Sequence, residues 1–272
     1  MKNLLKKILP IWLINFLKNI LPNKKNKLLK SLEFNYKNNI VFLGTDYGGW
    51  SFLDNNNLKN KFIISAGLGE DASFDIEIIS KYNCKVIVID PTPRAIDHYN
   101  EIIKNTGKTK SSLYEKGGKQ RISSYDLSKI NKENFILVEK ALFDEDNKEL
   151  KFFAPKNKNH VSYSINNWQN DYKKNSEFIK VKTVTIKNII NKFNIKDLEI
   201  LKLDIEGAEI EVVNNIMNER IFPNQILIEF DELNKMNELA INRFYKVHQR
   251  LLLENYKLIH TKNNFPDFLY IK

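Results

Sequence analysis

A glycine turn is the first place where residue types and spacing could serve chemistry. The run GLGEDASFD covers residues 67–75, and Gly67 and Gly69 carry no Cβ that would keep a cofactor away from the backbone. Glu70 and Asp71 follow at the predicted start of a helix, where two carboxylates repel a pyrophosphate but suit a cofactor with an ammonium and a sulfonium. The turn therefore favours S-adenosylmethionine over a dinucleotide, with a purely structural turn as the alternative.

Asp90 is the second candidate. It ends the apolar run KVIVID, about 20 residues after the glycine turn, where an acidic side chain accepts hydrogen bonds from both hydroxyls of a ribose. The alternative role is that of a helix N-cap before Pro91 and Thr92. The glycine turn at the expected distance ahead of Asp90 favours the ribose role.

The run LKLDIEGAE, residues 201–209, is the most distinctive. Asp204, Glu206 and Glu209 cluster where a strand gives way to a helix, and Gly207 bends the backbone between them. Three acidic groups in one cleft are costly unless they meet cations, metals or protons. We expect Asp204 next to the reacting methyl group. Glu206 and Glu209 could instead act as electrostatic caps of the helix, which is the favoured interpretation for Glu209.

Methyl transfer to a hydroxyl needs a group that takes up a proton. His160, in the polar run NHVSYS, is the first candidate because histidine titrates near neutral pH, and an exposed loop histidine is the alternative. Asp204 is the second candidate, and Glu206 belongs to the same catalytic set. Asp204 with Glu206 or Glu229 could bind Mg²⁺ through oxygen ligands. Their spacing is not diagnostic, so no metal site is predicted.

Strand-like and helix-like patterns alternate along the chain and must position these residues, which predicts an α/β fold with a mostly parallel sheet. Residues 134–142 read as one strand, with 149–155 as its hairpin partner. Residues 105–133 read as an irregular insertion. The remaining expectations are a β-like patch at 39–43, strands at 61–69, 85–90, 199–207 and 225–230, helices at 71–82, 93–104, 208–217 and 234–255, a strand entering a helix at 181–193, and a closing hairpin at 256–272.

Five runs occur in an order that resembles the FkbM family of S-adenosylmethionine-dependent methyltransferases, over roughly residues 40–272. They are GLGEDASFD, VIDPTPRA, VEKALFDEDNKELKFF, LEILKLDIEGAE and ILIEF. The second and fourth are the specific ones, whereas the glycine turn is generic. The resemblance implies the class I methyltransferase (Rossmann-like) fold, a seven-stranded sheet with an antiparallel C-terminal hairpin and helices on both faces. It also implies O-methylation, often of sugars or natural products.

The same resemblance implies a place along the cofactor for each candidate. It gives the methionine end to Gly67, Gly69, Glu70 and Asp71, the ribose to Asp90, Pro91 and Thr92, and the adenine to Ala141 and Leu142. The run GTDYGGW, residues 44–50, resembles the stretch before the first core strand of this family and predicts Tyr47 and Trp50 as walls of the site. A simple β-turn at Gly48 and Gly49 is the alternative.

Charge and composition limit the partners. The formal net charge is +10, and the single cysteine excludes an intramolecular disulfide and a multi-cysteine zinc site. No basic stripe with interleaved aromatic residues is present, so a nucleic-acid partner is not expected. Residues 1–30 form a basic amphipathic arm and linker, and 31–272 one domain. The apolar run within residues 1–22 falls short of the about 20 residues that span a membrane. Two interpretations remain: a packed or dimerising arm, which is favoured, and weak contact with an anionic membrane.

The sequence therefore predicts an O-methyltransferase that uses S-adenosylmethionine and modifies a sugar hydroxyl of a bacterial surface glycan, such as a capsular polysaccharide, or its precursor. A cytoplasmic enzyme, peripheral at the inner membrane face, fits this prediction, and a homo-oligomer is compatible with it. Two alternatives stay open. One is methyl transfer to an amine or a phosphate-linked small molecule, and the other is a non-catalytic binding module at the membrane.

Overall fold

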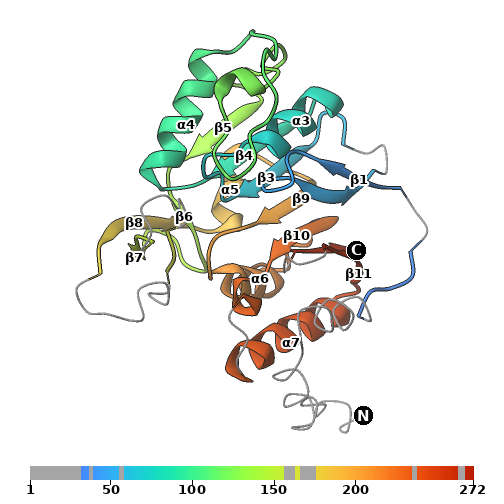
Figure 1. Cartoon of the computed structure of the whole chain (residues 1–272). Helices are drawn as coiled ribbons and strands as arrows, with labels where there is room; N and C mark the ends of the chain where they lie inside the picture. Colours follow the sequence, from blue (N-terminus) through green and yellow to red (C-terminus); the bar gives the residue numbers. More distant parts are fainter. Residues whose placement is uncertain are drawn as a thin grey trace, which may run out of the picture.

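The chain folds around one large mixed sheet, seen in a computed structural model (Figure 1). The structure describes residues 32–36, 39–54, 58–155, 163–165, 176–234, 238–262 and 267–272. The seven strands of the large sheet lie in the order β11, β12, β10, β9, β3, β4, β5. Their bounds are β3 Phe62–Ala66, β4 Lys85–Ile89, β5 Phe135–Val138, β9 Leu198–Leu203, β10 Gln225–Glu229, β11 Lys257–Thr261 and β12 Asp267–Ile271.

The strand directions place a ligand-binding edge at the middle of this sheet. Strands β9, β3, β4 and β5 pair in parallel, β10 pairs in parallel with β9, and β12 runs antiparallel to both of its neighbours, β10 and β11. The chain adds β4 and β5 on one side of β3 and later adds β9 and β10 on the other. The boundary between β3 and β9 is therefore a topological switch point, and ligands of such sheets bind outside the carboxyl ends of the strands there.

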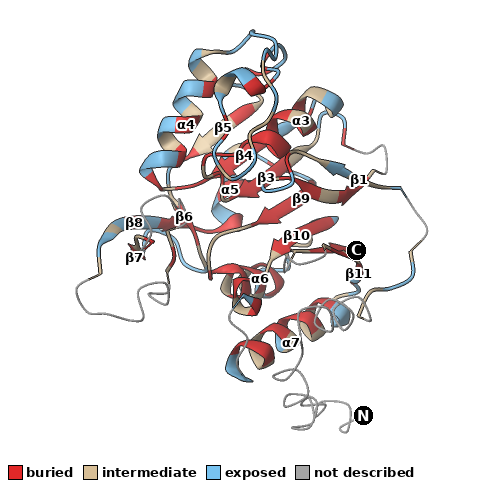
Figure 2. Ribbon diagram, viewed as in Figure 1, coloured by how far each residue is buried: buried red, intermediate tan, exposed pale blue. Residues whose placement is uncertain are grey.

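Helices cover both faces of the sheet because its strands are apolar on both sides. In β3, Ile64 and Ala66 pack in one core with the helices α5 to α7, whereas Ile63 packs in a second core with α3 and α4. Figure 2 shows the central strands almost entirely buried. The helices are α3 Ser73–Tyr82, α4 Pro93–Lys104, α5 Ile186–Phe193, α6 Glu209–Asn218 and α7 Glu238–Leu253, with the 3-10 helices η1 Ile122–Ser124 and η3 Asp231–Leu233.

Two small sheets flank the carboxyl edge of the large one. β1 (Ile40–Leu43) and β2 (Trp50–Leu53) form an antiparallel pair whose connecting turn holds the run GTDYGGW. The other small sheet has the strand order β6, β8, β7. In it β8 (Phe178–Val184) pairs in parallel with β6 (Ala141–Leu142) and antiparallel with β7 (Glu149–Phe153). Both small sheets therefore bring side chains to the edge where the switch point lies.

The predicted α/β class is confirmed, but one strand assignment is wrong. Residues 134–142 were expected to form a single strand, yet the chain leaves the large sheet after β5 and enters the small sheet at β6. The expected hairpin partner at 149–155 is β7, which pairs with β8 instead. The polar pair Glu139–Lys140 interrupts the apolar run where the two strands separate. Among the described residues, no helix is long and apolar enough to cross a membrane.

Candidate active site

A cavity of about 320 Å³ opens at the switch point. It lies at the carboxyl ends of β3, β4, β9 and β10 and is closed on its sides by the two small sheets. The lining residues are Tyr47, Gly48, Trp50, Gly67, Leu68, Gly69, Glu70, Asp71, Ile89, Asp90, Pro91, Thr92, Gly118, Ala141, Leu142, Phe152, Tyr163, Lys202, Asp204, Ile205, Glu206, Glu229, Asn234 and Asp267. The structure thus brings the sequence-predicted site residues together in one cavity, except His160, which lies outside the described residues.

The glycine turn depends on backbone conformations that favour glycine. Gly67 has φ of 86° and Gly69 has φ of 56°. A Cβ on Gly67 would lie 1.8 Å from the carbonyl oxygen of Asp204, so the ends of β3 and β9 touch at this point. Gly67 is therefore required by packing across the switch point, in addition to any approach of a cofactor.

Asp90 ties this turn to the end of β4. Its Oδ2 accepts hydrogen bonds from the backbone N–H groups of Leu68 and Gly69, each at 3.0 Å. Its Oδ1 accepts hydrogen bonds from the backbone N–H and the hydroxyl of Thr92, at 2.9 and 2.6 Å. Asp90 lines the cavity, as a ribose-binding residue must. The alternative role as N-cap of α4 is wrong, because the N-cap is Thr92 and no side chain makes a cap hydrogen bond there.

Glu70 and Asp71 differ in the groups that contact their carboxylates. Glu70 forms ion pairs with Arg94 at 3.6 Å and with Lys119 at 3.0 Å. Asp71 accepts hydrogen bonds from neutral groups, namely the Thr45 hydroxyl at 2.6 Å and the Ser73 backbone N–H at 3.0 Å. Of the two carboxylates, Glu70 is thus the one with basic partners, and Asp71 lines the cavity with hydrogen bonds from uncharged groups.

The run GTDYGGW is both a turn and a wall. The backbone N–H of Gly49 donates to the carbonyl of Thr45 at 2.8 Å, which closes the turn, while Tyr47, Gly48 and Trp50 line the cavity. Partial desolvation of the phenol and the nearby Asp204 carboxylate raise the pKa of Tyr47 to about 12. Tyr47 is therefore a neutral phenol at physiological pH and cannot serve as a ready base.

The DIEG turn after β9 is held by the first residue of α6. Glu206 has φ of 55° and Gly207 has φ of 104°, so two consecutive residues adopt the left-handed region. The buried Glu209 carboxylate accepts hydrogen bonds from the backbone N–H groups of Ile205 and Gly207, at 3.0 and 3.2 Å. These contacts fit the structural role favoured for Glu209 and leave Asp204 and Glu206 as the carboxylates of this run that line the cavity.

Asp204 shares its environment with Glu229, at the end of the neighbouring strand β10. Burial raises the pKa of Asp204, and Lys202 partly offsets that rise. Burial and the Asp204 carboxylate raise the pKa of Glu229 well above its ordinary value. Two close carboxylates in one apolar setting ionise one at a time. The pair as a whole therefore holds a proton more tightly than two separate carboxyl groups would, and a hydrogen bond links Asp204 to Glu229.

Lys202 and Asp267 belong to the same cavity and were missed from the sequence. The buried Lys202 ammonium donates to the carbonyl of Gly67 at 2.6 Å and lies 5.5 Å from the Trp50 ring centroid. The sequence feature that could have marked Lys202 is a single cation inside the strand run LEILKL, where Glu199 is the other charged residue and the rest are apolar. Burial raises the pKa of Asp267 to about 6. Asp267 begins the last strand, far along the chain from any motif, and no pattern marked it.

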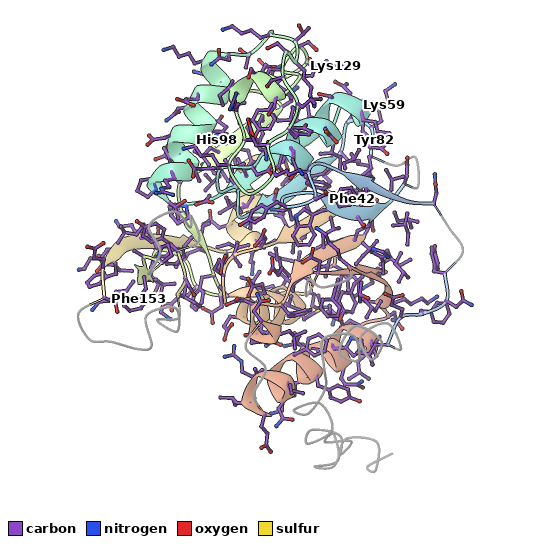
Figure 3. The ribbon with its side chains drawn as sticks, in the orientation of Figure 1. Phe42, Lys59, Tyr82, His98, Lys129 and Phe153 are labelled. Atoms are coloured by element: carbon purple, nitrogen blue, oxygen red, sulfur yellow. The ribbon has the colours of Figure 1, made fainter. Side chains whose placement is uncertain are left out.

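The segment 105–133 also reaches the cavity, through Gly118. It is anchored on the helices of one face of the sheet. The Tyr125 hydroxyl accepts from the Ala72 backbone N–H at 3.0 Å and lies 2.9 Å from His98 Nε2, and Lys129 donates to the Ser80 carbonyl at 2.9 Å. Figure 3 labels His98 on α4 and Lys129 in this segment. Burial lowers the pKa of His98 to about 4, so this histidine is neutral and serves packing.

Metal ligation has no arranged site in the described part of the chain. No group of three or more His, Cys, Asp or Glu side chains there is placed to hold a metal ion. Asp204, Glu206 and Glu229 all line the cavity, but they do not form such a group among the described residues.

Fold and cavity together define a class of protein, an α/β domain with a cavity at the switch point of its sheet. Comparison with family models matches residues 35–258 to the family described as Methyltransferase FkbM domain. Because the match covers most of the chain, the protein belongs to the FkbM methyltransferase family and is a methyltransferase, as the sequence predicted. Searches of curated proteins and of solved structures gave no match. Such methyltransferases in general take the methyl group from S-adenosylmethionine.

Proposed function

We propose that the protein transfers a methyl group from S-adenosylmethionine to a hydroxyl of a sugar, in a bacterial surface glycan or its precursor. One observation carries the proposal. The glycine turn with Asp71 and Asp90 and the carboxyl pair Asp204 and Glu229 line one cavity at the switch point. A donor site and a proton-accepting group would therefore border the same space, in which the acceptor can lie.

The lining residues fit the parts of the donor. Asp71, which lacks a cationic partner among its hydrogen bonds, would bind the ammonium of the methionine end. Asp90 would hold the ribose. Because Asp90 Oδ1 already accepts from the Thr92 hydroxyl, a ribose hydroxyl would replace or share that bond. The buried side chains Ala141 and Leu142 offer an apolar wall to the adenine. The bound donor supplies a methyl group that its sulfonium has already activated.

Asp204 is the described residue best placed to take the proton of the acceptor hydroxyl. A carboxylate whose pKa is raised is a stronger base than an ordinary one, and burial raises the pKa of Asp204. Glu229 would hold Asp204 in place through the hydrogen bond that links the two carboxyl groups. His160 stays a prediction for the same role. The aromatic walls Trp50, Phe152 and Tyr163 suit the apolar face of a sugar ring, and the carboxylates suit its hydroxyls.

An amine acceptor is the second candidate, and one observation favours it. Among the cavity-lining residues that the structure describes, seven are Asp or Glu and one, Lys202, is basic. Such a lining attracts a cationic or hydroxyl-rich acceptor and repels a phosphate at the reacting end. An amino sugar would satisfy both candidates, whereas a phosphate-linked group would have to point out of the cavity.

The acceptor is tested by incubating the full-length protein with methyl-labelled S-adenosylmethionine and a panel of nucleotide-linked sugars and amino sugars. We expect label in at least one sugar. Asp204→Asn should lower turnover about 10²- to 10⁴-fold because the variant cannot take up the proton, with donor affinity kept. Asp197→Asn, whose side chain is 68% exposed in a surface ion pair, is the matched control and should keep full turnover. Undiminished turnover in Asp204→Asn would remove Asp204 from the mechanism, and His160→Ala would then test the other base.

A further inference from the structure

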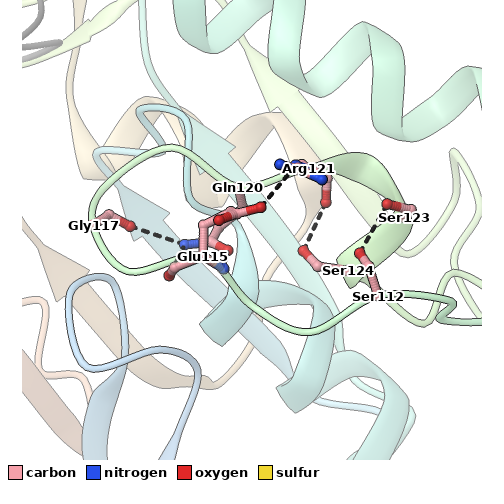
Figure 4. A network of polar contacts seen from close by, with 7 residues as sticks. All are labelled: Ser112, Glu115, Gly117, Gln120, Arg121, Ser123 and Ser124. Carbon is pink, nitrogen blue, oxygen red and sulfur yellow. Dashed lines mark hydrogen bonds and ion pairs between the residues drawn. The ribbon is translucent and has the colours of Figure 1, made fainter.

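The loop at residues 115–121 lies outside the motifs that identify the family, yet it is built as a rigid unit. Gln120 is 3% exposed and ties the loop together from inside. Its side-chain oxygen accepts from the Glu115 backbone N–H at 2.9 Å, and its amide nitrogen donates to the carbonyls of Glu115 and Gly117 at 3.1 and 2.9 Å. Arg121 pairs with the Glu115 carboxylate at 2.7 Å (Figure 4).

This unit is docked on the residues that follow the glycine turn. The Gln120 backbone N–H donates to the Glu70 carbonyl at 2.9 Å, and Lys119 forms a parallel bridge and an ion pair with Glu70. The Gln120 amide nitrogen also lies 3.4 Å from Asp71 Oδ2. Gln120 therefore links the interior of the loop to the carboxylate that we assign to the methionine end of the donor.

The loop meets the GTDYGGW turn across the mouth of the cavity. A Cβ on Gly118 would lie 2.4 Å from Cε1 of Tyr47, so the Tyr47 ring rests directly on the loop backbone. Both residues line the cavity, and the Tyr47 residue is 53% exposed. Asp71 is the common support, because its Oδ2 accepts from Thr45 in the turn and from Gln120 in the loop.

A second carboxylate joins the same two segments. Glu77 on α3 accepts from the Tyr114 hydroxyl at 2.7 Å through Oε1 and from the Gly44 backbone N–H at 2.8 Å through Oε2. Two chain segments more than 60 residues apart in sequence, 44–50 and 114–121, are thus fixed to the same two acidic side chains, Asp71 and Glu77. This shared support sets how Tyr47 and Gly118 lie relative to each other.

We propose that Gln120 is a positioning residue of the donor site, which holds Asp71 and the 115–121 loop so that Gly118 and Tyr47 cover the methionine end of the cofactor. The inference rests on the proposed function, because it takes the cavity to bind S-adenosylmethionine. It assigns to the insertion a role that the family motifs do not contain. Asp71 then accepts two short hydrogen bonds, from Thr45 and Ser73, and a longer one of 3.4 Å that it shares with the carbonyls around the Gln120 amide, so its orientation toward the donor ammonium is fixed.

Calorimetric titration of the full-length protein with two probes tests the inference. S-adenosylhomocysteine carries the amino-acid end, and adenosine lacks it. Gln120→Ala should lower the affinity for S-adenosylhomocysteine about tenfold, because the Asp71 carboxylate loses the hydrogen bond from the Gln120 amide that helps to orient it. The affinity for adenosine should stay unchanged. Ser112→Ala removes the hydrogen bond to Ser123 in the same insertion, away from Asp71, and should change neither affinity.

The remaining outcomes would contradict either the positioning role of Gln120 or the proposed function. Equal weakening of both probes in Gln120→Ala, or unchanged affinity for S-adenosylhomocysteine, would overturn the positioning role. If Gln120→Ala does not fold, Gly118→Ala replaces it, because its added methyl displaces the Tyr47 ring without removing a buried hydrogen bond. That variant should bind S-adenosylhomocysteine more weakly at an unchanged melting temperature, and unchanged binding would again overturn the inference. A wild-type protein that binds neither probe would instead contradict the proposed function.

Discussion

Replacing Gly67 with alanine is expected to destabilise the protein by about 4 kcal/mol or more and to abolish donor binding. The new Cβ would lie 1.8 Å from the Asp204 carbonyl oxygen, well inside any non-bonded contact. Asp204 cannot retreat, since its own backbone N–H donates to the Ala66 carbonyl at 3.1 Å. The carboxyl ends of β3 and β9 would have to separate, and the cavity lies on that junction. Denaturant unfolding and donor titration measure the two effects.

Gly107 supplies the matched control for this substitution. Its φ of 85° is nearly the same as that of Gly67, but a Cβ there would meet no atom within 4 Å. Gly107→Ala should therefore cost only the about 1–2 kcal/mol of a left-handed alanine and leave donor affinity intact. A Gly67→Ala protein as stable as Gly107→Ala would show that the strand ends at the switch point are not in the close contact described above.

Replacing Lys202 with methionine is expected to cost about 3–5 kcal/mol at pH 8, because it removes a buried cation from among carboxylates. Lys202 lowers the pKa values of Asp75, Asp204 and Asp267, and each of these groups also faces burial that raises its pKa. Asp90, Glu229 and Lys262 also act on the pKa of Asp204, and Lys262 and Asp204 act on that of Asp267. Without Lys202, the carboxylates would have to stay protonated or repel one another.

The stability that Lys202→Met loses relative to wild type should grow as pH rises. Burial raises the pKa of Asp267 to about 6 in the folded protein, above its value in the unfolded chain. A raised carboxylate pKa means that the folded state binds more protons, so its stability falls as pH rises from about 4 through 6. Loss of Lys202 raises the pKa values of Asp75, Asp204 and Asp267 further, so the decrease in stability continues to higher pH. The deficit of Lys202→Met relative to wild type should thus be small at pH 5 and large at pH 8.

Urea unfolding at the two pH values measures this deficit. Lys246→Met, at an exposed position of α7, is the control and should change stability by less than about 0.5 kcal/mol at both pH values. A Lys202→Met deficit that is the same at pH 5 and pH 8, or larger at pH 5, would show that Lys202 acts through packing on Trp50 instead of through the carboxylates.

Sequence reasoning was strongest where one local pattern determines the structure. The apolar runs at 61–69, 85–90 and 225–230 each contain a central strand, and the helical spacing at 71–82 and 93–104 gave α3 and α4 within two residues. The patch at 39–43 is β1. The glycine turn and the LKLDIEGAE run were located in the same way, because their residue types require a turn at a strand end. Both border the cavity, as expected for strand ends in a parallel sheet.

What the sequence missed depends on contacts between distant residues. In the run NFILVEKAL, the polar pair Glu139–Lys140 marks a break between β5 and β6, but the apolar residues on either side do not show that the two strands belong to different sheets. Gln120 meets Asp71 across 49 positions and Lys202 meets Gly67 across 135, so neither pairing leaves a local pattern. Asp204 was found for its motif, but its proton-sharing with Glu229 follows from the pairing of β9 with β10.

Calorimetric titration of the wild-type protein with S-adenosylmethionine tests the central claim most directly. We predict saturable binding at one site per chain, with binding strongly weakened in Asp90→Ala, because that substitution removes the ribose acceptor and releases the backbone N–H groups of Leu68 and Gly69. The absence of binding heat from a folded wild-type protein would contradict the assignment of the cavity as a donor site, and the proposed methyl transfer with it.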